Sequence, residues 1–190
     1  MLNTEGVSAC IDDVSSRENS SIGKLAQVIG QARLDGGLSN LSNGERVALF
    51  RLDPDGELRP HQVAALARAL IHAGLEPETW QPETWRRWAL IAHGIALAGH
   101  ANGFLGEQLQ KANVSESRVT KLLTSRGDAF RQLLPRLLRL LASKEVAPNW
   151  HEFGGLIIHE SRDETKAEAI RMKIAGRYFS ALAKADKSAA

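Results

Sequence analysis

The 190-residue chain contains a single cysteine, Cys10, so it can form neither an intramolecular disulfide nor a thiolate metal cluster. Its longest apolar runs are broken by arginine, histidine or glycine well short of the length of a membrane span. Residues 1–21 contain acids and serines but no apolar core of the length that a signal peptide requires. We therefore expect a cytoplasmic protein that makes no contact with a membrane.

Catalytic and cofactor-binding motifs are also missing. The glycine pairs at 36–37 and 154–155 lack the flanking strand that phosphate-binding glycine loops require, and no Gly-x-Ser-x-Gly elbow occurs. His93 and His100 lie seven residues apart on one predicted helix, which separates them by about 10 Å along its axis. Because this distance is too long for one metal ion, we expect packing or capping roles for both histidines. The sequence predicts no enzyme, no cofactor and no metal site.

Long runs that alternate polar and apolar residues, which are typical of strands, are absent as well. Apolar residues recur instead at helical spacing along nearly the whole chain. Pro135 lies inside one of the predicted helices and is expected to kink it or to start a second segment. The pattern predicts an all-α fold of about nine helices, which begin near Ser21, Asn43, Pro60, Pro82, Phe104, Ser115, Asp128, Trp150 and Asp163.

The distribution of charge divides the chain. Residues 1–110 carry nine basic and thirteen acidic side chains, whereas residues 111–190 carry fifteen basic and nine acidic ones. Because the net charge changes sign near the turn at residues 102–103, we place a boundary between two packed helical bundles there. The predicted segments are a disordered tail at residues 1–21, an N-terminal helical bundle at 22–102, a basic C-terminal helical bundle at 103–184 and a tail at 185–190.

Positive charge is most concentrated between Lys111 and Lys144, where eight basic residues face only two acids. On the predicted helix that begins at Asp128, three arginines span an arc of about 140° away from the apolar face, namely Arg131, Arg136 and Arg139. A concentration of cations without a catalytic constellation indicates a surface that binds a polyanion. The alternative is an ordinary solvated helix face.

Residues 105–123 have the pattern of a helix-turn-helix, which reads duplex DNA in the major groove. A helix, a polar turn with Val114 and a second helix follow one another, and Asn113 with Glu116 predicts a capping box between them. The second helix carries three side chains suited to DNA contacts: Ser117, Arg118 and Lys121. A helix-turn-helix DNA-binding regulator is therefore one alternative function, and a purely structural helical adaptor is another.

The order of several motifs is distinctive from residue 105 onward. The series begins with a leucine-glycine helix start at Leu105-Gly106 and a Ser-Glu-x-Arg turn at Ser115–Arg118. It continues with a leucine pair at Leu122-Leu123, a leucine-rich helix with an arginine at Leu137–Leu141, and Trp150 before the next helix. This series resembles the small subunit of the type I-E CRISPR surveillance complex Cascade, the CasB family. Residues 44–52 and 85–88 resemble the N-terminal helices of that family more weakly, and the whole resemblance covers about residues 23–184. The long N-terminal extension and Pro135 depart from the family pattern.

The resemblance implies an all-α protein of two helical bundles that has no enzymatic activity and acts in antiviral defence. It implies backbone and large Cascade subunits and a second copy of the chain as partners. It also implies contacts with the crRNA, the target DNA strand and the displaced single strand of an R-loop. R-loop formation is nearly balanced energetically, so a basic groove that holds the extruded strand can tip it.

The candidate nucleic-acid-binding residues are all basic, and we expect them to line a common trough for sugar-phosphate chains without reading sequence. The C-terminal set is Lys111, Arg118, Lys121, Arg126, Arg131, Arg136 and Arg139. The N-terminal set falls on helices that match basic helices of the family and consists of Arg46, Arg51, Arg86 and Arg87. A weaker third set opens the last predicted helix and consists of Arg162 and Lys166.

Overall fold

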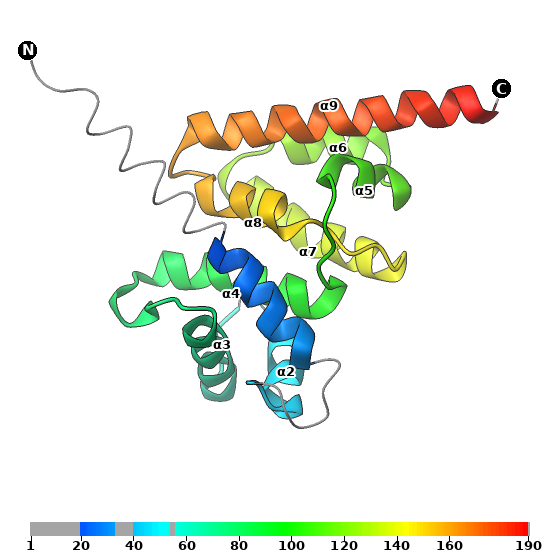
Figure 1. Ribbon diagram of the computed structural model, residues 1–190. Helices are drawn as coiled ribbons and strands as arrows, with labels where there is room; N and C mark the ends of the chain where they lie inside the picture. The colour runs from blue at the N-terminus through cyan, green and yellow to red at the C-terminus, as the bar shows by residue number, and fades with distance from the viewer. Residues whose placement is uncertain (1–19, 33–39, 54–55, 190) are drawn as a thin grey trace, which may run out of the picture.

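The computed structural model describes residues 20–32, 40–53 and 56–189, and these residues form helices and connecting turns without any strand. The all-α fold is thus confirmed. None of the described helices is both long and apolar enough to cross a membrane. A first helix covers residues 20–32, and it is followed by α2 (Asn43–Phe50), α3 (Pro60–His72), the short 3-10 helix η1 (Pro77–Thr79), α4 (Pro82–Ala98), α5 (Leu105–Lys111), α6 (Glu116–Thr124), α7 (Gly127–Ser143), α8 (Trp150–His159) and α9 (Glu164–Ala189) (Figure 1).

Two helices begin at the prolines that predicted them. Pro60 and Pro82 occupy the first positions of α3 and α4, where the missing N–H of proline costs no hydrogen bond. The predicted tail at residues 1–21 lies mostly outside the described residues. At the other end, α9 continues to Ala189, five residues beyond the predicted end of the last helix at residue 184.

The capping box was placed wrongly by the sequence analysis. Asn113 has a φ of 54° and ends α5, and the N-cap of α6 is Ser115, whose side chain makes no capping hydrogen bond. The structure forms a capping box at α2 instead. There the Ser42 hydroxyl accepts from the Glu45 amide at 3.2 Å, and the Ser42 amide donates to the Glu45 carboxylate at 2.7 Å.

Pro135 does not divide α7, which runs as one helix from Gly127 to Ser143. A proline inside a helix costs about 3 kcal/mol. The apolar face of α7 is buried, and each large buried side chain contributes about 1.5–3 kcal/mol. Packing therefore outweighs the missing hydrogen bond. The side chains of α7 that are fully or almost fully buried are Phe130, Leu134, Leu138 and Leu141.

α4 lies at the centre of the molecule and packs against α2 and α3 as well as against α7 and α8. Gly94 of α4 makes this close approach possible, because an added Cβ would lie 2.1 Å from the ring of Trp150 and 3.1 Å from Leu138. The Trp150 indole donates a hydrogen bond to the Gly99 carbonyl at 2.7 Å. Side chains from both predicted bundles consequently share one continuous hydrophobic core among the described residues.

The second close approach joins α5 to α9. A Cβ on Gly106 would lie 2.3 Å from the Ile174 carbonyl oxygen and 2.6 Å from the Tyr178 amide nitrogen, so only glycine fits there. The Tyr178 hydroxyl donates to the Val114 carbonyl at 2.7 Å, in the turn between α5 and α6. Figure 1 shows α9 lying across α5, α6 and α8. This packing fixes the position of the predicted helix-turn-helix.

Candidate nucleic-acid interface

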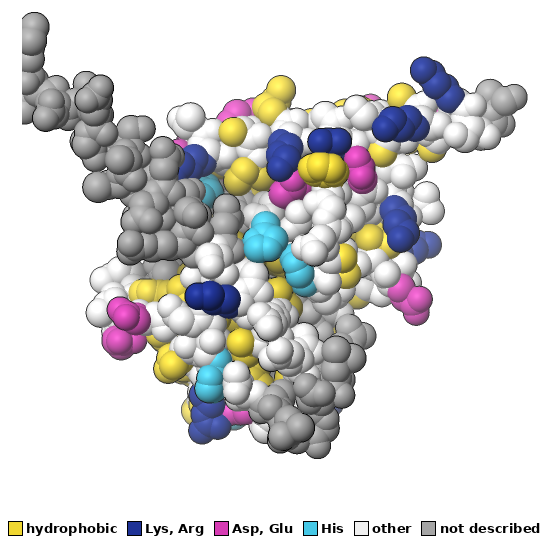
Figure 2. Space-filling view, in the orientation of Figure 1, with side chains coloured by type: hydrophobic (Ala, Val, Ile, Leu, Met, Phe, Trp, Pro, Cys, Tyr) yellow, Lys and Arg dark blue, Asp and Glu magenta, His cyan; other side chains and the backbone are white. Residues whose placement is uncertain are grey.

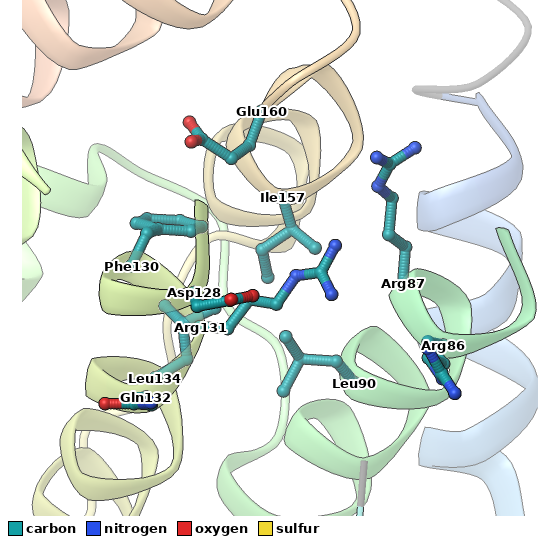
Figure 3. A pocket seen from close by; sticks show the side chains of 10 residues that line it. All are labelled: Arg86, Arg87, Leu90, Asp128, Phe130, Arg131, Gln132, Leu134, Ile157 and Glu160. Atoms are coloured by element: carbon teal, nitrogen blue, oxygen red, sulfur yellow. The ribbon is translucent and has the colours of Figure 1, made fainter. Parts of the chain in front are cut away.

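Three of the predicted cations meet where α4 packs against α7. Arg86 and Arg87 of α4 and Arg131 of α7 line a cavity of about 380 Å³, which we call the arginine cleft. Figure 3 shows Arg87 and Arg131 reaching into this space from different helices. The other side chains that line it are mostly apolar or acidic, namely Leu90, Asp128, Phe130, Gln132, Leu134, Ile157 and Glu160. The fold thus joins cations from both predicted bundles in one cleft.

The electrostatics of the arginine cleft are unbalanced. One carboxylate oxygen, Oε1 of Glu83, accepts from Arg131 and also lies 3.5 Å from a guanidinium nitrogen of Arg87. Burial lowers the pKa of the Arg87 guanidinium below its ordinary value, and the positive charges of Arg162 and Arg131 lower it further, whereas the negative charges of Glu83 and Glu160 oppose this shift. Arg87 and Arg131 therefore share one acid, and Arg162 is close enough to repel Arg87.

Two further acids, Asp128 and Glu160, line the cleft together with its three arginines. Glu160 is buried, accepts a hydrogen bond from the Gly127 amide at 2.9 Å and forms an ion pair with Arg171. Its direct ion-pair partner is thus an arginine outside the cleft, and its charge also favours the charged form of Arg87. Asp128 lies in the first turn of α7, where the free N–H groups of a helix start favour a carboxylate, and its side chain is exposed.

A second group of predicted cations is exposed on α6 and α7. Within the described part of the chain none of these four side chains has an ion-pair partner: Arg118, Lys121, Arg136 and Arg139. Arg139 lies near α4, and its positive charge therefore contributes to lowering the pKa of His93 on that helix. Arg131 and Arg139 are eight residues apart on α7, or about 12 Å along its axis. Arg139 therefore extends the positive charge along the boundary between α4 and α7 beyond the cleft.

Other predicted cations are engaged within the protein. Arg126 donates to Glu164 at 2.8 Å and to Glu168 at 2.9 Å, both on α9. Lys166 lies 3.8 Å from Asp163 and lines a different hollow with His151 and Lys173. These ion pairs lower the charge that the two side chains can offer to a ligand.

The remaining predicted cations lie apart from the arginine cleft. Arg46 donates to the Asn43 side chain and lines a third hollow, beside α4 and the end of α7. Arg51 follows α2, Lys111 ends α5, and both are exposed. Figure 2 shows further basic side chains spread along α9 among apolar and acidic ones. The structure therefore divides the predicted cations among several surfaces.

Two groups of charged residues escaped the sequence analysis. Glu83 could not be identified from local patterns, because its partner Arg131 lies 48 residues away. On α9, Arg177 and Lys173 flank the Phe104 ring, at 3.6 Å and 5.6 Å from its centroid. Their i, i+4 spacing was visible in the sequence, but the aromatic ring between them was not.

The histidines have the packing roles that were predicted. His93 lies 3.2 Å from the Leu49 carbonyl at the end of α2, and the His100 ring accepts from the Trp150 amide at 3.2 Å. Burial lowers the pKa of both imidazoles, and the nearby His151 lowers that of His100 further. The part of the chain that the structure describes contains no group of three or more His, Cys, Asp and Glu side chains arranged for a metal ion.

The family model described as CRISPR-associated protein Cse2 matches residues 45–179. The chain belongs to the Cse2 family. This membership confirms the resemblance to the small subunit of type I-E Cascade. No protein of curated function and no solved structure matches the chain.

Membership of the Cse2 family makes the chain a subunit of the multisubunit Cascade complex. The matched range extends from α2 into α9 and contains both walls of the arginine cleft, together with every predicted nucleic-acid-binding residue. It leaves out the helix at residues 20–32 and everything before it. The family assignment does not favour the helix-turn-helix regulator, because Cse2 is a structural Cascade subunit family.

Proposed function

We propose that this Cse2 family member is a non-catalytic small subunit that binds the backbones of crRNA and target DNA in a type I-E Cascade. In this role it stabilises the R-loop, including the displaced single strand, during antiviral defence. The observation that supports this most directly is the arginine cleft, where Arg87 and Arg131 share the single carboxylate of Glu83. A cleft with surplus positive charge suits a nucleic acid, which carries a negative charge on every nucleotide.

The chemistry of the exposed cations agrees with binding to sugar-phosphate chains. Guanidinium groups bind phosphate oxygens through paired hydrogen bonds and need no base edge, so binding does not depend on sequence. The exchange of a DNA duplex for an RNA–DNA heteroduplex is nearly balanced, and a few phosphate contacts on the extruded strand are enough to shift it. A non-catalytic protein can therefore control R-loop formation.

The proposed protein partners are the backbone and large subunits of Cascade and a second copy of the chain. Exposed apolar side chains support such contacts, because large ones on a protein surface favour association. Met172 and Phe179 on α9 are 64% and 40% exposed, and Ile71 on α3 is 57% exposed. These side chains lie on helices other than α6 and α7, so protein contacts there would leave the exposed cations of α6 and α7 accessible.

The test is R-loop formation by reconstituted Cascade that carries Arg118→Ala, Arg136→Ala and Arg139→Ala in this subunit. We expect the triple variant to form fewer R-loops and its R-loop formation to depend less steeply on salt. Four phosphate contacts on a single strand would give a salt slope of about −3, at roughly −0.7 per contact. The control variant carries Lys24→Ala, Arg59→Ala and Lys184→Ala, which remove the same charge from exposed positions outside the predicted set. Equal R-loop formation by the two variants would contradict the proposal.

A competition assay separates the two alternatives. A helix-turn-helix regulator would prefer one duplex sequence over random single strands and would use base contacts from the second helix of the hairpin. A structural adaptor would bind no nucleic acid at any salt concentration. The proposed function predicts instead that random single strands compete equally well with one another, and that their binding weakens steeply as salt is added.

A further inference from the structure

The ion pairs of the arginine cleft leave part of the hydrogen-bonding capacity of its arginines unused. A guanidinium group is a planar fork that prefers two oxygens of one acid. Here Arg87 and Arg131 both approach the same oxygen of Glu83, so both forks keep N–H groups that this carboxylate does not engage. A phosphate group carries more oxygens in a tetrahedral arrangement and can engage both guanidinium groups at once.

The surroundings of the two arginines strengthen their attraction for an anion. The side chain of Arg87 is only 13% exposed, and the cavity beside it is bounded by the apolar side chains of Leu90, Leu134 and Ile157. Electrostatic interactions gain strength where apolar walls keep water away. A volume of about 380 Å³ also leaves room beyond one phosphate group for part of the attached sugar.

Glu83 is placed so that it can leave the two arginines at small cost. Its side chain is 38% exposed, and ion pairs of this exposure contribute little to stability. It also lies in the first turn of α4, where free backbone N–H groups favour a carboxylate even without the arginines. A competing anion would therefore displace the Glu83 carboxylate, which has another favourable position at the start of α4.

We propose that the arginine cleft binds one phosphodiester group of the nucleic acid, and that Glu83 occupies this position as an internal counter-ion in the free protein. Binding then exchanges the Glu83 carboxylate for a phosphate on Arg87 and Arg131. The inference rests on the proposed function, since it names the place where one backbone phosphate is held. It also assigns a role to a residue outside the predicted set, and it predicts that removing the charge of Glu83 tightens binding.

The chain supplies a matched control in its repeated Pro-Glu-Thr-Trp motif, which occurs at residues 77–80 and 82–85. Glu78 has the same place in the first copy as Glu83 has in the second, and it is exposed in the short helix η1. In the described residues Glu78 has no ion-pair partner. Glu78→Gln therefore removes the same charge five residues away without releasing an arginine.

The experiment measures the affinity of the full chain for a random single-stranded DNA and its dependence on salt. Glu83→Gln should tighten binding about fivefold, the equivalent of one exposed ion pair. Glu78→Gln should change it by less than about twofold, as expected for one distant, screened charge. Arg87→Ala with Arg131→Ala should weaken binding and reduce the salt slope by about 0.7, for one lost phosphate contact.

The decisive variant combines all three substitutions. If Glu83 acts through the two arginines, Glu83→Gln gains nothing once Arg87→Ala and Arg131→Ala are present, because coupled residues give non-additive effects. Equal tightening by Glu83→Gln and Glu78→Gln, or tightening that persists without the two arginines, would overturn the inference. The proposed function would survive either result, provided that the wild-type chain binds single strands.

A separate measurement covers the case in which the isolated chain binds no DNA. Inorganic phosphate should raise the melting temperature of Glu83→Gln more than that of the wild type, at constant ionic strength, because a ligand that binds the folded state stabilises it. The variant without Arg87 and Arg131 should not respond. Stabilisation of all variants alike would exclude a phosphate site in the cleft, whatever the outcome of the R-loop assay.

Discussion

Two arginine clusters of the protein differ in the number of carboxylates that accompany their arginines. In the arginine cleft, Arg87 and Arg131 share the one carboxylate of Glu83. In a second cluster, which we call the α8–α9 network, two arginines share three carboxylates. Its members are Arg126, Arg171, Glu160, Glu164 and Glu168. We propose that the ratio of acids to arginines, rather than the number of arginines, decides which cluster can bind an external anion.

The two clusters also differ in burial. Arg171 is 2% exposed and ties the end of α8 to α9 through Glu160, whereas Arg131 in the cleft is 33% exposed. A buried arginine that is surrounded by carboxylates stabilises the fold and has no charge to spare. A half-exposed arginine that shares one carboxylate contributes little to stability and can exchange its partner. The comparison therefore predicts opposite consequences for the same kind of substitution.

The largest effect is expected for Arg171→Met. Removing the guanidinium leaves the buried Glu160 carboxylate without its partner, and breaking a buried pair in this way costs about 3–5 kcal/mol. Urea unfolding followed by circular dichroism measures the change in the free energy of unfolding. The double variant with Glu160→Gln should recover part of the loss. A loss below about 1 kcal/mol would show that the network is not structural.

A smaller effect is expected when the cleft is made to resemble the network. Gln132 lines the cleft and is exposed, so Gln132→Glu adds a further carboxylate to the lining of the cleft. We expect single-strand affinity to fall about fivefold, as for one added exposed ion pair. Gln27→Glu, at an exposed position of the first helix, is the charge-matched control. Equal affinities of the two variants for single-stranded DNA would show that the number of carboxylates in the cleft does not control anion binding.

Arg126→Ala should have a still smaller effect, and on stability only. Its ion pairs with Glu164 and Glu168 are exposed, and such pairs contribute about 0–1 kcal/mol. Because its charge is already neutralised, the salt slope of DNA binding should equal that of the wild type. A shallower slope for Arg126→Ala would place this residue at the nucleic acid after all.

The smallest effect is a mild loss of stability in weak acid. Burial holds the pKa of His93 and His100 below the ordinary value of 6.5 in the folded protein. As the pH falls below 6.5, the unfolded chain binds more protons than the folded one, so the free energy of unfolding decreases. Chemical unfolding at pH 7 and pH 5 measures this slope, and His93→Gln should reduce it. An unchanged slope would assign it to other groups.

Local patterns of the sequence predicted most of the helices correctly. Helix starts at Pro60 and Pro82 depend on the fixed φ of proline, and the apolar spacing around Phe130 and Leu134 depends only on the helical repeat. Both are properties of a few neighbouring residues. The errors concern competition between local preferences. Asn113 was assigned to a helix start but ends a helix, because asparagine favours both positions.

The candidate site was predicted less completely. The sequence identified Arg86, Arg87 and Arg131 as cations that could bind a backbone, and the structure brings them together. It also pointed to Arg126, whose partners on α9 lie 38 and 42 residues further along the chain. No local pattern distinguishes Arg126 from Arg131, since both are arginines near the start of the same helix. Only the packing of α4 and α9 against α7 gives Arg126 two carboxylates of its own, whereas Arg131 shares one carboxylate with Arg87.

The amino-acid sequence by itself determined that this protein is helical, where its helices begin, and that its order of motifs belongs to a Cascade small subunit. These properties follow from interactions between residues a few positions apart. The tertiary structure alone decided which cations stay available to a nucleic acid. Glu83 and Arg131 are 48 residues apart, and a charge is neutralised by whichever acid the fold brings within reach.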